Sequence, residues 1–444
     1  MTTTARAPKY SKDWQEEYRR KVVPAEEAAS HIKSGDTVVF STGREAQYLG
    51  LQLAARKDEL REVKVYVPTP GRDFGWYDPG WAESFSVTIN YVNPVAREAM
   101  QGRLVDFYII PATPPMAPDL GMSIDVYLIE VSPPDEQGFC SFGASVWDKR
   151  ERIAQSKLVI AEVNSNLIRT YGENFVHVSQ ISYFVENPPP RERRRFTRGE
   201  TPDPHVKAIA EQVKKVLKDG DTLQIGAGTI TEWLPELGVF DNFVDLGYHS
   251  EITPRGIVRL VRNGVITGTR KTLHPGKVVA TAAGGAREDM EFVNDNPLFE
   301  LYSMYHTHDI KVIAAHDNMV AVNGALAVDL TGQITAESLG ASMYTGPGGQ
   351  PAFAVGACLS RGGRSIHVLP SVTSDGRSRI THQLLPGTIV TIPRTFTDIV
   401  ITEYGAAYLR GTTQRQRAER LIAIAHPDHR AELRKEAQKL FWPS

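Results

Sequence analysis

The chain has 444 residues, of which 41% are hydrophobic and 23% charged, and its formal net charge is −2. This length exceeds what one hydrophobic core usually serves, so we expect a soluble globular protein with two domains. A nearly neutral chain gives no electrostatic reason to expect nucleic acid or an anionic membrane as a partner.

The sequence also shows no signal for membrane insertion or secretion. No apolar stretch approaches the ~20 residues of a membrane-spanning helix. The N-terminal segment is polar and charged and lacks the apolar core of a signal peptide. Cys140 and Cys358 lie far apart without metal-ligand spacing, which is typical of reduced thiols. The sequence therefore predicts a cytoplasmic protein.

The first half of the chain alternates short apolar runs with helical patterns. The runs are rich in valine and isoleucine and are bounded by Gly, Pro, Asp or Asn, as buried strands of a parallel or mixed sheet are. They lie at 38–40, 63–67, 105–110 and 158–163. Helical patterns at 24–33 and 46–55 alternate with these runs, so this half is predicted to be an α/β domain.

A proline-rich and arginine-rich stretch at 186–195 separates the two halves. Its three consecutive prolines stiffen the chain and its charges keep it in solvent, so it is predicted to be a linker. The arginines could also suggest nucleic acid, but no other basic or aromatic surface supports that interpretation. We therefore expect domains at 1–190 and 191–444.

The second half repeats the α/β pattern. A helix is predicted at 204–218, and strands at 222–225, 278–280, 310–314, 365–369 and 399–403. Gly220-Asp221-Thr222 echoes Gly35-Asp36-Thr37, and 399–405 echoes 158–164, although chance similarity between α/β units would give the same impression. The prediction is two similar open α/β domains with mostly parallel sheets and a site in the cleft between them.

One glutamate stands out as a candidate for chemistry. Glu251 follows an apolar run and precedes Pro254, so we expect it where a strand gives way to a turn. There a sheet could hold its carboxylate against a ligand. His249, two residues earlier, is predicted to lie on the same face of the strand. The competing interpretation is an ordinary surface or ion-paired glutamate.

A glycine-rich loop at 344–350 is the second candidate. Gly346, Gly348 and Gly349 allow the backbone to approach a ligand closely, and its N–H groups can hold an oxyanion or a phosphate. The loop lacks the Lys-Ser/Thr ending of a nucleotide P-loop. His306 and His308 could form a metal pair, but without a third ligand a solvated pair is favoured, and no metal is predicted.

Together these segments resemble the acetyl-CoA hydrolase/transferase group of family I coenzyme A transferases, particularly 4-hydroxybutyrate and butyrate CoA-transferases. The resemblance covers nearly the whole chain. It rests on ordered motifs at 126–139, 161–164, 170–172, 249–251, 271–277, 323–333, 344–350 and 402–405.

The resemblance implies that Glu251 is the nucleophile. In such enzymes its carboxylate attacks an acyl-CoA thioester and forms an acyl-glutamyl anhydride, which the released thiolate converts to a glutamyl-CoA thioester. A carboxylic acid acceptor then reverses the steps. No permanently bound cofactor is implied, because coenzyme A enters as part of the substrate. The implied assembly is a homodimer or homotetramer.

Further site residues follow from the same resemblance. The Gly348 and Gly349 amides match oxyanion donors, and Asn323 matches a polar residue near the thioester. Glu403 matches a second acidic residue of the site, although a structural carboxylate that caps a loop is an equal alternative. Contacts with coenzyme A are expected from Gly346, Gln350, Lys271, Lys277, Gly226 and Gly228, with a solvated surface as the alternative for either lysine.

The chain departs from the family pattern at four positions, one of which is Arg44, a bulky residue for the first glycine turn. Pro351 removes an amide donor from the glycine loop, Ala352 replaces an acid, and Tyr248 stands where a small aliphatic residue is common. These departures suggest a larger acid as substrate. Two other functions stay open: an acyl-CoA hydrolase on the same scaffold, and a non-catalytic protein that binds coenzyme A.

Overall fold

The computed structural model describes residues 10, 12–110, 122–189 and 201–443. Internal contacts divide the chain into two units. The first comprises Met1–Arg195 with Glu291–Tyr305, and the second comprises Phe196–Met290 with His306–Ser444. The predicted domains 1–190 and 191–444 were continuous, whereas the structure groups a short later segment with the first unit. Residues 190–195 of the predicted linker lie outside the described residues.

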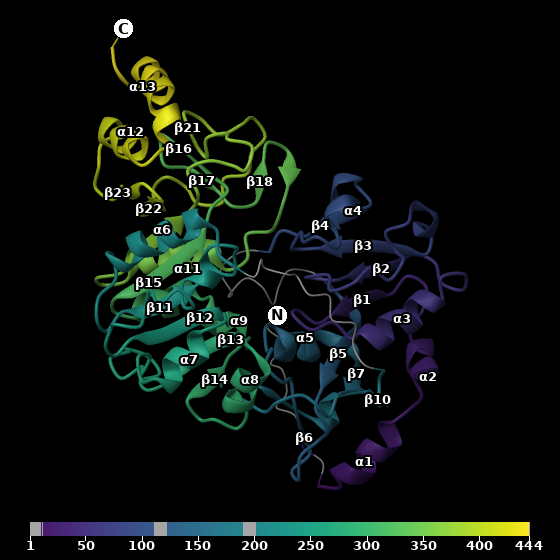
Figure 1. Ribbon diagram of the computed structural model, residues 1–444. Helices are drawn as coiled ribbons and strands as arrows, with labels where there is room; N and C mark the ends of the chain where they lie inside the picture. The colour runs from purple at the N-terminus through teal and green to yellow at the C-terminus, as the bar shows by residue number, and fades with distance from the viewer. Residues whose placement is uncertain (1–9, 11, 111–121, 190–200, 444) are drawn as a thin grey trace. The chain divides into compact units, whose positions relative to one another are not determined.

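The first unit is built on a parallel sheet of seven strands (Figure 1). The strand order is β10-β7-β5-β1-β2-β3-β4. Its longest strands, β5 and β7, are almost continuously buried, as expected where helices cover both faces of a parallel sheet. The strands are β1 (Thr37–Phe40), β2 (Val63–Tyr66), β3 (Phe85–Ile89), β4 (Val105–Phe107), β5 (Ile124–Val131), β7 (Ser156–Val163) and β10 (Tyr183–Glu186).

Short helices and two small strand pairs complete the first unit. Helices α2 and α3 pack on each other, and α5 packs against β5 and β7. The antiparallel pair is β6 (Phe139–Ser141) with β9 (Phe175–His177), and the parallel pair is β8 (Tyr171–Gly172) with β14 (Phe299–Leu301). The helices are α1 (Trp14–Lys21), α2 (Ala25–Ser30), α3 (Gln47–Ala55), α4 (Arg97–Gln101), α5 (Lys149–Gln155) and the 3-10 turns η1 (Pro79–Trp81) and η3 (Val178–Gln180).

The sheet of the second unit runs in the order β23-β22-β20-β15-β11-β12-β13. All neighbours pair in parallel except β23, which is antiparallel to β22. The strands are β11 (Thr222–Ile225), β12 (Gly247–Thr253), β13 (Val278–Ala283), β15 (Met319–Gly324), β20 (Arg364–Val368), β22 (Ile399–Thr402) and β23 (Gly405–Tyr408). Smaller sheets contain β16 (Ala327–Asp329), β17 (Ile334–Thr335), β18 (Ser338–Leu339), β19 (Ser342–Met343) and β21 (Ile380–Thr381).

The two sheets are wound in the same way. In each, the first strand of the unit, β1 or β11, lies in the interior, the next strands of the chain add on one side, and later strands add on the other. Gly35 and Gly220 precede these strands with φ of 82° and 77°, so the first sequence echo falls on equivalent turns. The second sequence echo, between 158–164 and 399–405, does not fall on equivalent strands. Strand β7 is the second strand away from β1 in its sheet, whereas β22 is the third strand away from β11.

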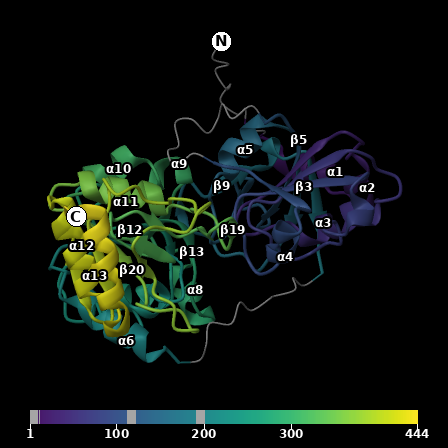
Figure 2. The ribbon, with the colours of Figure 1, turned by 90° about the horizontal axis from the view of Figure 1, so that it is seen from above.

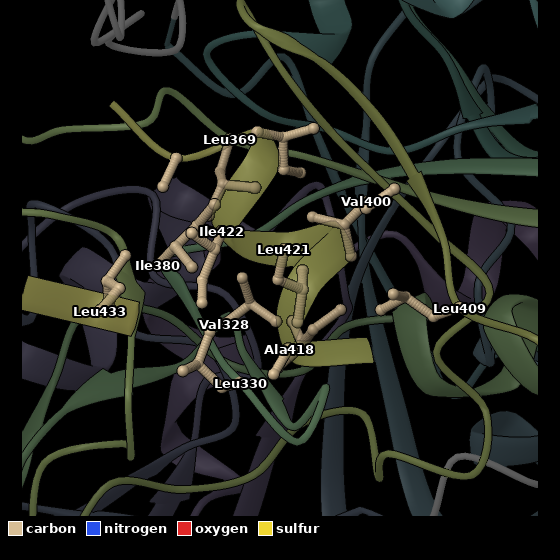
Figure 3. Close-up of a cluster of buried hydrophobic side chains, with 14 of the residues drawn as sticks. Val328, Leu330, Leu369, Ile380, Val400, Leu409, Ala418, Leu421, Ile422 and Leu433 are labelled. Atoms are coloured by element: carbon tan, nitrogen blue, oxygen red, sulfur yellow. The ribbon is translucent and has the colours of Figure 1, made fainter. Parts of the chain in front are cut away.

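Helices and a large apolar cluster stabilise the second unit. Helix α11 packs against β15, β20 and α10, and α12 lies beside α13 (Figure 2). The cluster joins β16, β22 and both terminal helices through side chains such as Val328, Val400 and Leu421 (Figure 3). The helices are α6 (Pro204–Lys214), α7 (Ile257–Arg262), α10 (Ile310–Ala315), α11 (Gln350–Leu359), α12 (Gln414–Ala423), α13 (Pro427–Phe441) and the 3-10 turn η4 (Thr231–Trp233). Helices α8 (Arg287–Val293) and α9 (Met304–Thr307) each include residues of both units.

The predicted strand at 310–314 is wrong, because this segment forms helix α10. Its isoleucines and valine suggested a strand, but Asp309 caps the helix by accepting a hydrogen bond from the Lys311 N–H at 2.8 Å. Ile313 is fully buried and contacts α11 closely at Gly356. Tertiary packing and a capping residue therefore overrode the β-propensity of the run.

Candidate active site

Glu251 lies within strand β12, the strand next to the interior strand β11 of the second unit. The strand continues to Thr253, so the expected position at a strand-to-turn junction is wrong by two residues. The Glu251 side chain is 23% exposed, in a strand otherwise largely buried. A carboxylate fixed by a parallel sheet but open to solvent is a suitable position for a nucleophile or a ligand contact.

Two donors hold the same oxygen of this carboxylate. The Gly349 N–H donates to Glu251 Oε2 at 2.8 Å, and His308 Nε2 lies 3.1 Å from the same atom. Because a carboxylate only accepts hydrogen bonds, His308 Nε2 carries the proton here. Among the described residues no hydrogen bond reaches Oε1. One oxygen of Glu251 is thus fixed and the other is left for chemistry.

Gly349 is placed by the helix that follows it. It is the N-cap of α11, so its N–H has no acceptor within the helix and points at the carboxylate. The positive end of the helix dipole also favours an anion there. A Cβ at this position would overlap Glu251 Oε2 and come within 2.6 Å of the His308 ring. The glycine is required by this close approach, since its φ of −80° would suit other residues.

The environment lowers the pKa of Glu251. Burial alone would raise it, because it disfavours the charged form. The hydrogen bond and charge of His308 and the Gly349 N–H oppose that effect and outweigh it, so the pKa lies below the ordinary value of the group. Glu251 is therefore a carboxylate at neutral pH.

His308 is itself held by a chain of hydroxyl groups. Its Nδ1 lies 2.8 Å from Thr307 Oγ1, which is hydrogen-bonded to Thr281 Oγ1 on β13. His249 Nε2 lies 3.0 Å from the Thr307 carbonyl oxygen. Since His249 and Glu251 both reach the 307–308 segment, they share a face of β12, as predicted.

The role of His308 was not predicted from the sequence, which suggested a metal pair or a solvated pair with His306. His306 instead faces His274, with 2.9 Å between their Nε2 atoms. No group of three metal-ligating side chains occurs in the part of the chain that the structure describes. The His308–Glu251 contact joins residues 57 positions apart, so only the tertiary fold reveals it.

Asn323 lies at the end of β15 and forms two hydrogen bonds with Gln224 of β11, both at 3.0 Å. A Cβ on Gly226 would overlap the Asn323 amide oxygen, which explains the glycine. Gln350 connects the glycine loop to this region through a 3.1 Å hydrogen bond to the Gly324 carbonyl. The structure therefore gathers these residues at the carboxyl ends of β11, β12 and β15.

This is the point where the sheet order reverses, since β12 lies on one side of β11 and β15 on the other. In open α/β sheets, ligands bind outside the carboxyl ends of the strands at such a point.

Family models and relatives identify the family to which the chain belongs. The acetyl-CoA hydrolase/transferase N-terminal domain matches residues 6–190, and the C-terminal domain of the same family matches residues 285–437. The chain belongs to the acetyl-CoA hydrolase/transferase family. The 4-hydroxybutyrate coenzyme A transferase of Clostridium kluyveri is 39% identical over 97% of this chain and 100% of its own length.

Other members of the family match along the whole chain. The succinyl-CoA:cyclohexane-1-carboxylate CoA transferase of Geobacter metallireducens is 35% identical over 97% of this chain and 98% of its own length. The crystal structure of RipA from Yersinia pestis superposes with a TM-score of 0.88 at 31% identity, over 96% of this chain and 99% of that chain. The chain is thus an enzyme of the coenzyme A transferase class, as predicted.

Glu403, the second acidic residue implied by the family resemblance, caps a loop. It accepts hydrogen bonds from the Ser371 N–H at 2.9 Å and the Ser371 hydroxyl at 2.5 Å. His205 Nδ1 lies 3.3 Å from the same carboxylate, whose side chain is 7% exposed. Of the two alternatives, the geometry favours the structural carboxylate, and no described contact joins it to Glu251.

The predicted contacts with coenzyme A occupy different environments. The Lys271 side chain is buried, and its ammonium donates to the carbonyls of Tyr248 and Lys277 at 2.9 and 2.8 Å. This arrangement supports the strand β12 rather than a phosphate. Gly228 lies just beyond β11, where its carbonyl accepts from the Glu232 N–H. Binding of coenzyme A by Gly346, Gln350, Lys277, Gly226 and Gly228 stays a prediction.

The departures from the family pattern have simple structural effects. Pro351 stands in the first turn of α11, where its missing N–H would have had no helical acceptor. Ala352 is fully buried in the same turn. The Tyr248 hydroxyl donates to the Ile252 carbonyl, and its ring is buried on the face of β12 opposite Glu251. No hydrogen bond between described residues joins Pro351, Ala352 or Tyr248 to Glu251, and the expectation of a larger acid stays a prediction.

Among the described residues, no helix combines the length and the apolar character that crossing a membrane requires. The predicted cytoplasmic location, the predicted homodimer or homotetramer, and the expectation of neither nucleic-acid nor membrane partners stay predictions.

Proposed function

We propose that this enzyme exchanges coenzyme A between an acyl-CoA thioester and a carboxylic acid, with Glu251 as the nucleophile. The observation that carries the proposal is the asymmetric setting of Glu251. Oε2 is fixed by two donors, while Oε1 has no hydrogen bond among the described residues and the side chain is partly exposed. A lowered pKa keeps the attacking group ionised.

The proposed reaction conserves one high-energy acyl bond throughout. Glu251 Oε1 attacks the thioester carbonyl, the C–S bond breaks, and coenzyme A leaves as a thiolate, which gives an acyl-glutamyl anhydride. The thiolate then attacks Cδ of Glu251, the Cδ–Oε1 bond breaks, and the first acid leaves with that oxygen. An acceptor carboxylate attacks the resulting glutamyl-CoA thioester, and the same steps in reverse yield the new acyl-CoA.

The names of the relatives guide the choice of substrates. They act on acids such as 4-hydroxybutyrate and cyclohexane-1-carboxylate, with succinyl-CoA as one donor. We propose a carboxylic acid substrate of this size range and no permanently bound cofactor. Contacts with the distant parts of coenzyme A would supply binding energy that is used at the thioester.

The test is to trap the covalent intermediate. The enzyme is mixed with an acyl-CoA, quenched, and digested, and the mass of the peptide that contains Glu251 is measured. We expect a glutamyl-CoA thioester in the parent enzyme and none in Glu251→Gln, which should retain the parental melting temperature but lose transfer. Full transfer in Glu251→Gln would refute the proposal. Release of free coenzyme A at the same rate with and without an acceptor acid would instead show the hydrolase.

A further inference from the structure

We propose that His308 is a catalytic residue, and that its Nε2–H and the Gly349 N–H form an oxyanion hole for the glutamyl carbonyl of Glu251. The inference rests on the proposed function, because it concerns the steps in which the carbonyl carbon of Glu251 is attacked. It goes beyond the roles that the family resemblance implies, in which the Gly348 and Gly349 amides are oxyanion donors and His308 has no role.

The geometry satisfies the requirement for such a site. Both donors converge on one oxygen, at 2.8 Å from the Gly349 nitrogen and 3.1 Å from His308 Nε2. Oxyanion donors typically lie about 2.7–3.1 Å from the position that the charged oxygen occupies. Glu251 Oε2 is bonded to the carbon that reacts, so these donors are in place before charge develops.

The chemistry places negative charge on this oxygen twice in each turnover. When the thiolate attacks Cδ of the anhydride, a C–S bond forms and the C=O electron pair moves onto Oε2. The pair returns as the Cδ–Oε1 bond breaks and the first acid leaves. When the acceptor carboxylate attacks the thioester, the pair moves onto Oε2 again and returns as the thiolate leaves. Oε2 never leaves the enzyme during these steps, so fixed donors can serve both.

The surroundings of His308 suit this task. The side chain is 4% exposed, and its ring meets Phe353 edge-on with centroids 5.2 Å apart, so packing fixes its orientation. Low exposure also strengthens its interaction with a charged oxygen.

The Thr307 hydroxyl lets His308 keep the Nε2 proton in both protonation states. If the ring is neutral, Nδ1 accepts a hydrogen bond from Thr307 Oγ1; if it is protonated, Nδ1 donates to the same oxygen. Thr281 Oγ1 bonds to Thr307 Oγ1 and can donate or accept in turn. The ring can therefore donate from Nε2 to the Glu251 carboxylate, to its anhydride or to its thioester without rotating.

The experiment compares three variants of the full-length protein. His308→Phe removes the donor, His308→Gln keeps an N–H donor, and His306→Phe removes a ring from the same segment that faces His274 and not Glu251. Single-turnover mixing with acyl-CoA, acid quenching and intact mass measurement give the rate of glutamyl-CoA formation. Steady-state kcat and KM, and the melting temperature of each variant, are measured in parallel.

We expect His308→Phe to slow glutamyl-CoA formation and kcat about 10²-fold with KM for acyl-CoA changed less than threefold, the loss typical of one oxyanion donor. His308→Gln should recover at least tenfold of that loss, and His306→Phe should resemble the parent. A folded His308→Phe variant that forms the thioester at the parental rate would overturn the inference.

If His308→Phe fails to fold, the rate of glutamyl-CoA formation in His308→Gln tests the inference instead. A folded His308→Gln with a loss below tenfold supports the donor role, and a loss of about 10²-fold overturns it. Either result is separate from the proposed function, which fails only if Glu251→Gln still transfers coenzyme A.

Discussion

Glu251 lies within strand β12 and Glu403 directly follows strand β22, both in the second unit, yet the environments of the two carboxylates differ. Glu403 is 7% exposed and accepts two hydrogen bonds from Ser371, with His205 as a third neighbour. Glu251 is 23% exposed, and both of its donors reach the same oxygen. The first carboxylate accepts a hydrogen bond on each oxygen, whereas among the described residues the second accepts hydrogen bonds on one oxygen only.

This difference separates a structural carboxylate from a reactive one. A fully bonded carboxylate stabilises a loop and is costly to remove, because its donors would be left unsatisfied. A carboxylate held by one oxygen has a fixed direction and a free reacting atom. The number of donors is therefore less informative than their distribution between the two oxygens.

Among the substitutions that test this comparison, Gly349→Ala should have the largest effect on kcat. The added Cβ would overlap Glu251 Oε2 and the His308 ring, so the donors and the nucleophile must separate. We expect kcat to fall about 10²–10³-fold, as for loss of an oxyanion donor. Gly324→Ala is the control, because φ there is negative and its Cβ meets no atom within 4 Å. Equal kinetics for the two variants would contradict the role given to Gly349.

Glu251→Asp shortens the nucleophile by one methylene while keeping its charge. The carboxylate should withdraw from Gly349 and His308, and a misplacement of about 1 Å can cost about 10²-fold in rate. We expect kcat to fall by that factor with an unchanged melting temperature. The paired variant Glu403→Asp should show the reverse, with a lower melting temperature and near-parental kcat. Both are measured by steady-state assay and thermal unfolding.

Thr307→Val tests the support of His308 rather than the donor itself. The substitution keeps the shape of the side chain but removes the hydroxyl next to His308 Nδ1. One neutral hydrogen bond contributes about 1 kcal/mol, so kcat should fall about fivefold. Thr335→Val, at a buried threonine whose hydroxyl forms hydrogen bonds with the Ser338 backbone, is the matched control and should leave kcat unchanged. A kcat loss as large as that of His308→Phe would mean that Thr307 acts directly.

Glu403→Gln should affect stability more than activity. The amide group cannot accept hydrogen bonds on both atoms, so one donor of Ser371 loses its partner. We expect the free energy of unfolding to fall by about 1–3 kcal/mol in chemical denaturation. Turnover should stay within twofold of the parent. A large loss of kcat without a loss of stability would place Glu403 in the chemistry, as the family resemblance implies.

The smallest expected effect is on the pH dependence of stability, and it involves two buried histidines that take no part in the proposed reaction. Burial lowers the pKa of His316 to about 3 and of His367 to about 4, and neither ring has a hydrogen-bond partner among the described residues. These groups are neutral in the folded state, so their contribution to stability is present above about pH 6.5 and is lost as the pH falls towards 4. The double variant His316→Phe/His367→Phe should flatten the decline of melting temperature between pH 6.5 and 4. An unchanged slope would assign the decline to other groups.

Much of the fold was predictable because local signals agreed with the tertiary structure. Short apolar runs bounded by turns became β1, β2, β7 and β11, and the glycine turns before β1 and β11 indicated the repeated winding. The failure at α10 shows the limit, since a short run of isoleucines and valine fits a buried helix as well as a strand.

Site residues were predictable from the sequence only where they belong to a motif of the family. Glu251 and Gly349 were found through the family pattern, and the structure joins them across 98 positions. His308 was visible in the sequence but had no recognisable partner, because the turn after β13 and the helices before β15 decide what it contacts. Spacing along the chain carries no information about such a contact.

The use of a main-chain donor at Gly349 also affects how the active site can evolve. The Gly349 donor is a main-chain N–H, which every residue except proline supplies, so any substitution other than proline keeps the group and acts through the bulk added beside Glu251. His308, by contrast, can be lost by a single codon change. Evolution can therefore adjust or discard the side-chain half of this donor pair, while the backbone half is inherited with helix α11 itself.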